Sequence, residues 1–151
     1  MTACRSILVL LDDFPHADQA LERAIELAGR DDAWLILLHV IEPVHPPAVG
    51  AAYVGGLLSA ESEDHAEALL GRAAARVPEG IPVHRVIRHG DAAAEILCRV
   101  EAAGHDLVVM GSRGRGSIRS LLLGSVSRAV IHHSPAPVVT VHAEAAKRAA
   151  A

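Results

Sequence analysis

A glycine-rich segment in the last third of the chain has the residue types that bind an anionic ligand. Two residues separate Gly111 from Gly114, nine separate Gly114 from Gly124, and Ser125 follows directly. Glycines leave main-chain amides uncovered, and successive amides can form a concavity that binds anions. A helix that begins at Ser125 would add unpaired N–H groups and the positive end of its dipole. The spacing therefore predicts a phosphate site.

Side chains can add donors to this site. The hydroxyl groups of Ser125 and Ser127 are candidates, and Arg113 and Arg115 could reach the outer phosphates as charged donors. The segment is not a Walker loop, because no lysine occupies the required place. It is not the dinucleotide fingerprint either, because Arg119 stands where the third glycine should be.

Other chemistry has less support in the sequence. There are ten histidines, but the adjacent pair His132 and His133 would face different directions on a helix, so surface positions are favoured over a zinc site. Ser112 is not in a nucleophile elbow. Cys98 falls inside a predicted helix, where we expect it to be buried. We therefore expect no dedicated enzyme.

Strands and helices are predicted to alternate along the chain. Apolar runs predict strands at residues 7–11, 34–40, 81–87, 107–110 and 138–141. Helical spacing and capping residues predict helices at 15–29, 59–77, 91–104 and 125–133, with a long loop at 41–58. This order predicts an α/β fold: an open, doubly wound, five-stranded parallel sheet with helices on both faces, Rossmann-like. Such sheets bind ligands at the carboxyl ends of strands, where the strand order reverses.

Composition limits the class of protein. The chain has 151 residues, a net charge of −4 and 2% aromatic residues, which predicts one domain over residues 1–143 with a tail at 144–151. The acidic balance and the few aromatics argue against nucleic acid as a partner. No apolar run is long enough to span a membrane. Two cysteines and no recognisable signal peptide lead us to expect a cytoplasmic protein.

The stretch from Val109 to Val141 resembles the C-terminal signature of the universal stress protein family. The nucleotide-binding members carry G-x2-G-x9-G-[ST], which this chain matches at the three glycines and the serine described above. The start of the chain resembles the family's first strand, with Asp12 at its acidic position. Leu38-His39-Val40 resembles the end of the second strand, and the resemblance covers essentially the whole chain. It implies the adenine nucleotide alpha hydrolase-like variant of the predicted fold.

The resemblance implies a role for individual residues. Asp12 would contact the adenosine near the ribose, and Val40 would hold adenine through its main-chain amide and carbonyl. Phe14 stands where the family has a small residue and would narrow the pocket, and Asp13 is expected to cap the following helix. The ribose side and the phosphates would be held by Met110, Gly111, Arg113, Gly114, Gly124, Ser125, Val126 and Ser127.

The expected function follows from the same resemblance. It implies a stress-response regulator or protective protein that binds ATP, or AMP or cyclic AMP, with or without Mg²⁺. It also implies a homodimer that pairs through the strand Val138–Val141. Two alternatives stay open: an interaction module of the same fold that needs no nucleotide, and a slow ATPase.

Overall fold

The computed structural model describes residues 3–13, 15–43, 51–112 and 123–142, with the main chain alone at 51–62. Strands and helices alternate throughout this part of the chain, as the sequence predicts. Their bounds are β1 (Ser6–Leu10), α1 (Pro15–Asp31), β2 (Trp34–Ile41), α2 (Ala51–Arg76), β3 (Val83–His89), α3 (Ala92–Ala103), β4 (Leu107–Gly111), α4 (Ser125–His133) and β5 (Val138–Val141).

The five strands form one parallel sheet in the order β3-β2-β1-β4-β5. The predicted fold class is confirmed. The strand order reverses between β1 and β4, which lie side by side although β4 is distant in sequence. β3 and β5 are the edge strands, and Pro82 directly before β3 agrees with an edge position.

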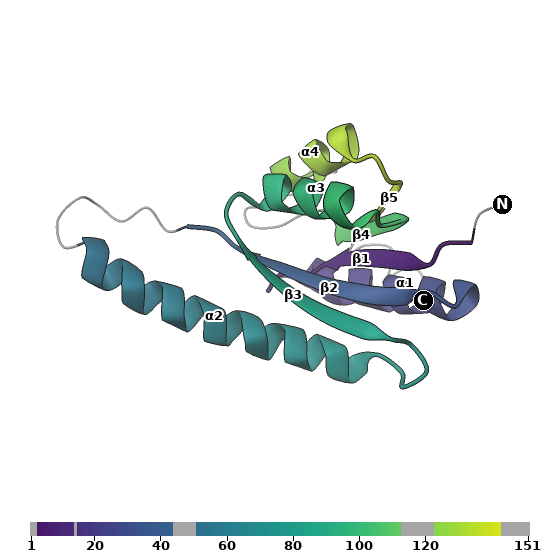
Figure 1. Ribbon diagram of the computed structural model, residues 1–151, viewed down its shortest axis with the longest axis horizontal. Coiled ribbons are helices and arrows are strands. Elements are labelled where there is room, and N and C mark those ends of the chain that lie inside the picture. Colours follow the sequence, from purple (N-terminus) through teal and green to yellow (C-terminus); the bar gives the residue numbers. More distant parts are fainter. Residues whose placement is uncertain (1–2, 14, 44–50, 113–122, 143–151) are drawn as a thin grey trace.

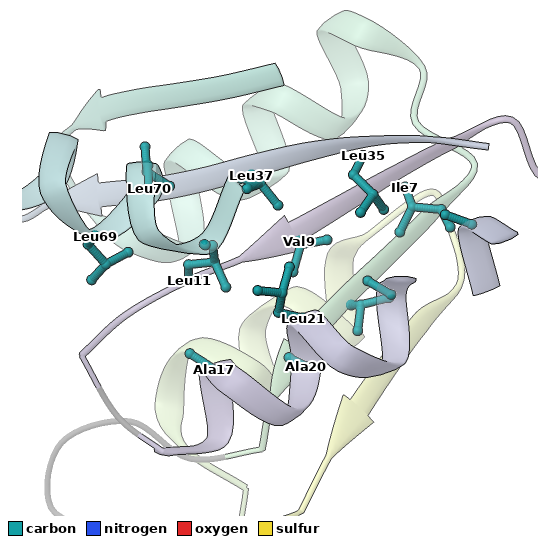
Figure 2. Packing of buried hydrophobic residues seen from close by; sticks show 14 of the residues in the cluster. Ile7, Val9, Leu11, Ala17, Ala20, Leu21, Leu35, Leu37, Leu69 and Leu70 are labelled. Atoms are coloured by element: carbon teal, nitrogen blue, oxygen red, sulfur yellow. The ribbon is translucent and has the colours of Figure 1, made fainter. Parts of the chain in front are cut away.

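The sheet has an apolar core on each of its two faces, because alternate residues of a strand point to opposite sides. α1 and α2 cover one face, and α3 and α4 the other (Figure 1). Figure 2 shows the first core, where side chains of β1 and β2 meet those of the two helices. Its labelled members are Ile7, Val9, Leu11, Ala17, Ala20, Leu21, Leu35, Leu37, Leu69 and Leu70.

The predicted ends of α3 are confirmed. The Asp91 carboxylate accepts from the N–H of Ala94 at 2.9 Å, and Gly104 ends the helix in the left-handed conformation with φ 65°. The prediction that Cys98 is buried is wrong, because its side chain is exposed. α3 buries Ile96 and Val100, and a residue midway between two such positions lies on the opposite side of the helix.

Two predicted boundaries were also wrong. α2 begins at Ala51 rather than Ser59, so residues 51–58 are helical and not part of a loop. β3 covers 83–89 rather than 81–87, because Ile81 belongs to the preceding turn, where its N–H donates to the Pro78 carbonyl at 3.0 Å. In the described part of the chain, every helix is too short or too polar to cross a membrane.

Candidate functional site

The predicted site residues converge on the carboxyl edge of the sheet. Asp12 follows β1, Val40 lies near the end of β2, and Gly111 ends β4. β1 pairs with both β2 and β4, so the strands on either side of β1 are about 10 Å apart. This edge includes the reversal of strand order, which is where open α/β sheets bind ligands.

Hydrogen bonds attach the start of α4 to the end of β4. The N–H of Gly124 donates to the Ser112 carbonyl at 2.9 Å. The Ser127 hydroxyl donates to the carbonyls of Gly111 at 3.0 Å and Ser112 at 3.2 Å, and Ser127 is only 3% exposed. This hydroxyl therefore holds the helix against the strand. The phosphate contact of Ser127 stays a prediction. Because the hydroxyl already donates to two carbonyls, the group of Ser127 that we expect to contact a phosphate is the main-chain N–H.

The first turn of α4 presents main-chain donors at this edge. Gly124 precedes the helix in an extended conformation and supplies no side-chain cap. The first main-chain bond of the helix runs from Arg128 to the Gly124 carbonyl. Among the described residues, none accepts from the N–H groups of Ser125, Val126 or Ser127. These are the amides that a helix N-terminus can offer to an anion.

Gly111 lies against the start of α1. A Cβ added at Gly111 would come within 2.6 Å of the His16 Cβ, closer than two carbon atoms can approach. The missing side chain is therefore required by packing between β4 and α1. This is a different reason from the one that the sequence suggested, which was close approach of a ligand.

Val40 turns its main-chain polar groups toward the side where β1 has ended. Along β2, the Leu35 N–H bonds toward β3 and the Leu38 carbonyl accepts from Leu11 on the β1 side. The Ile41 carbonyl accepts from Gly90 on the β3 side. Because successive residues alternate between neighbours in a parallel ladder, Val40 faces the β1 side. Within the described residues, its N–H and carbonyl have no partner.

His39 and Met110 are packed beneath this edge. The half-buried His39 donates from Nδ1 to the Leu11 carbonyl at 2.8 Å. The Met110 side chain is 1% exposed and belongs to the core under α3 and α4. Met110 can therefore line a ribose only through its main chain.

Asp13 contacts α2, which the sequence did not predict. Its two carboxylate oxygens accept from His65 Nε2 at 2.7 and 2.8 Å, and both side chains are about half exposed. No periodic signal could have identified this pair, because His65 lies 52 residues away on a polar helix face. The pair joins the end of β1 to α2 beside the half-buried Asp12.

A buried serine–histidine contact lies at the opposite edge of the sheet. Ser6 Oγ and His105 Nδ1 are 2.7 Å apart, and burial, followed by the nearby Arg99 charge, lowers the pKa of His105. Both residues are buried, and their contact joins β1 to the loop before β4. Because it lies at the end of the strands away from the site, it cannot contact a ligand bound there.

Several predicted residues lie outside the described part of the chain: Phe14, Arg113, Gly114 and Arg115. Their predicted roles stay predictions. Among the residues that the structure does describe, no three His, Cys, Asp or Glu side chains gather in a way that could hold a metal ion.

Comparisons with known proteins agree on one family. Residues 4–142 match the profile of the universal stress protein family. Universal stress protein A homolog 2 of Coxiella burnetii is 38% identical over 144 residues, which cover 91% of this chain and 94% of that protein.

Two solved structures show the same fold. A universal stress protein in complex with cAMP superposes with a TM-score of 0.72 at 24% identity, covering 93% of this chain and 99% of that one. A family member from Arabidopsis thaliana with AMP bound gives a TM-score of 0.62 at 22% identity, covering 91% of each chain.

Proposed function

The chain belongs to the universal stress protein family, and from this membership we propose that it binds an adenine nucleotide at the carboxyl edge of its sheet. The two solved relatives named above were crystallised with cAMP and AMP, both of which are adenine nucleotides. The ligand that we propose for this chain is ATP, accompanied by Mg²⁺.

The observation that carries this proposal is the unpaired main-chain edge of Val40. Its N–H and carbonyl lie in the plane of the sheet with no partner among the described residues. Adenine offers a ring-nitrogen acceptor beside an exocyclic amino donor on its Watson–Crick edge, so one base can satisfy both groups. Binding of adenine would give the N–H and the carbonyl of Val40 the hydrogen-bond partners that they otherwise lack among the described residues.

We propose that the phosphates bind at the start of α4. The amides of Ser125, Val126 and Ser127 face this end of the sheet, and the helix dipole adds a partial positive charge. The distance from β2 to β4 across β1, about 10 Å, is comparable to the length of a nucleoside with its first phosphate. Asp12 then lies beside the ribose, and Gly114 and Arg113 complete the phosphate site.

We propose that the nucleotide makes the protein a stress-response regulator or protective binding protein rather than a dedicated enzyme. A homodimer formed through β5 would present two such sites to a partner.

Isothermal titration of the purified chain with ATP, AMP and cyclic AMP, each with and without Mg²⁺, tests the proposal. We expect saturable heat with at least one of them. A folded sample that gives no heat with any of the three contradicts the proposal and favours the nucleotide-independent interaction module. Sustained phosphate release from Mg²⁺–ATP would instead favour the slow ATPase.

A further inference from the structure

We infer that His39 is a positioning residue that keeps the main-chain edge of Val40 open, and that it thereby sets the choice of base. This inference rests on the proposed nucleotide function. It concerns a side chain that need not touch the ligand, and it acts through the end of β1.

The first step is the hydrogen-bond register between β1 and β2. Leu10 pairs with Leu38, and the last bond of this ladder runs from the Leu11 N–H to the Leu38 carbonyl at 2.8 Å. In a parallel ladder, the next bond would run from the Val40 N–H to the Leu11 carbonyl. The bond after it would run from the Asp13 N–H to the Val40 carbonyl. The structure forms neither of these two bonds between the described residues.

The second step is what occupies the Leu11 carbonyl. His39 Nδ1 lies 2.8 Å from this oxygen. A carbonyl oxygen only accepts, so Nδ1 carries the hydrogen and donates it. The bond is partly buried, and Leu11 itself is 3% exposed, so water competes weakly for it. His39 thus donates to the oxygen that the Val40 N–H would reach in a continued ladder, and the structure forms the His39 bond and not the Val40 bond.

The third step is why His39 can do this without disturbing β2. The main chain of His39 faces β3, where it pairs with Ile87, so its backbone is not part of the ladder with β1. Its side chain lies on the face of the sheet covered by α1 and α2, as alternation from Leu37 requires. Leu11 belongs to the same core. The imidazole therefore reaches the end of β1 from within its own face.

The consequence is selectivity for adenine over hypoxanthine. An open Val40 offers one donor and one acceptor. Adenine matches them with its N1 acceptor and amino donor. Hypoxanthine presents an N1–H donor and an oxygen acceptor in the corresponding places, so both contacts are mismatched. If the Val40 N–H instead donates to the Leu11 carbonyl, it can no longer form a hydrogen bond that distinguishes the two bases.

Amide hydrogen exchange measures the state of Val40 without any nucleotide. In the wild type, we expect the Val40 amide to exchange at least about tenfold faster than the ladder amides of the same strand, because no described residue accepts from it. In His39→Leu, the Leu11 carbonyl loses its His39 donor, and we expect the Val40 amide to pair with it and become protected. In His39→Asn, whose side-chain N–H₂ can replace the Nδ1 donor, the amide should stay open.

Binding of AMP and inosine monophosphate measures the consequence. The wild type should prefer AMP by about tenfold, the effect of one mismatched pair of hydrogen bonds. His39→Leu should lose most of this preference, and His39→Asn should restore it. The control is His84→Leu on β3, whose ring contacts Trp34 at the other end of the sheet. It should keep the wild-type preference, and thermal unfolding shows whether each variant is folded.

The possible failures are distinguishable. A wild type that binds no adenine nucleotide contradicts the proposed function, and the role of His39 in base choice falls with it. A wild type that binds AMP, together with a folded His39→Leu that keeps the same base preference, contradicts the inference alone. A protected Val40 amide in the ligand-free wild type also overturns the inference, whatever the titrations give.

Discussion

At the scale of single residues, Gly111 shows that a motif position can serve packing as well as a ligand. Its absent Cβ leaves room for His16 at the start of α1. The same closeness fixes where α1 begins relative to the end of β4, and the Gly111 carbonyl accepts from Ser127. One residue therefore joins β4 to both of the helices that border the site.

Replacing Gly111 by alanine should destabilise the protein by about 1–3 kcal/mol, because the new methyl group would overlap His16 and force the helix to shift. Denaturant unfolding measures this change. The matched control is Gly29→Ala, where a Cβ meets nothing within 4 Å inside α1, and a gain of about 0.5–1 kcal/mol is expected. Equal effects of the two substitutions would contradict the packing argument.

A second substitution separates the clash from other effects. In a His16→Gly background, the nearest atom to the added methyl group is absent, so Gly111→Ala should cost less than it does in the wild type. This non-additivity is expected because the two residues are in contact. Strictly additive effects would show that the cost at Gly111 arises elsewhere.

Residue identities at the site could be predicted only in part. The spacing of Gly111, Gly124 and Ser125 predicted a phosphate site, and the structure has these residues at the carboxyl edge of the sheet. The partners of Asp13 and Gly111 could not be predicted, because His65 and His16 are distant in sequence and belong to helix faces with no distinctive pattern. Such contacts depend on how helices dock, which a single sequence does not encode in local spacing.

At the scale of elements, the first turn of α4 supplies the main-chain donors that we propose bind the phosphates. Gly124 has φ −62° and ψ 163°, an extended conformation that is compatible with a following proline. Ser125 is the first helical residue, a position that proline tolerates because its missing N–H has no helical partner there. This gives a way to delete one proposed phosphate donor without disrupting the helix.

We expect Ser125→Pro to weaken nucleotide binding by about tenfold, because one N–H donor to a charged phosphate is lost. Ser125→Ala keeps the amide and removes the hydroxyl, and its affinity should stay within about threefold of the wild type. Isothermal titration compares the two, with thermal unfolding as the check on folding. If the alanine variant loses as much as the proline variant, the hydroxyl rather than the helix amide holds the ligand.

The order of elements was predictable because each apolar run and each cap acts locally. β1, β2, β4, β5 and α4 lie where the pattern placed them, within two residues. The start of α2 was not predicted correctly, because Gly55 and Gly56 indicated a loop where the structure has a helix. Each glycine costs a helix only about 1 kcal/mol. Leu69 and Leu70 anchor α2 on the sheet, and an anchored helix extends without a new nucleus.

At the scale of the whole molecule, the strand order leaves β5 with one unpaired edge in the described chain. The Val108 N–H bonds to the Pro137 carbonyl, and the Ser112 N–H bonds to the Val141 carbonyl. Alternation then directs Val139 toward β4, and directs Val138 and Thr140 outward. An outward row of main-chain donors and acceptors is a template for pairing with a second chain. This edge is where we propose that two copies meet around a two-fold axis.

Replacing Thr140 by proline should abolish that dimer and leave the fold intact. The outward N–H of Thr140 is not part of the ladder with β4, so its loss costs no bond within the sheet. Between two copies, the same proline would remove one donor from each strand and place a ring in the interface. Sedimentation velocity should show a dimer for the wild type and a monomer for Thr140→Pro, with nucleotide binding retained because the site lies at the β1–β4 reversal. A folded variant that still sediments as a dimer would exclude β5 as the interface, and a monomeric wild type would exclude the dimer itself.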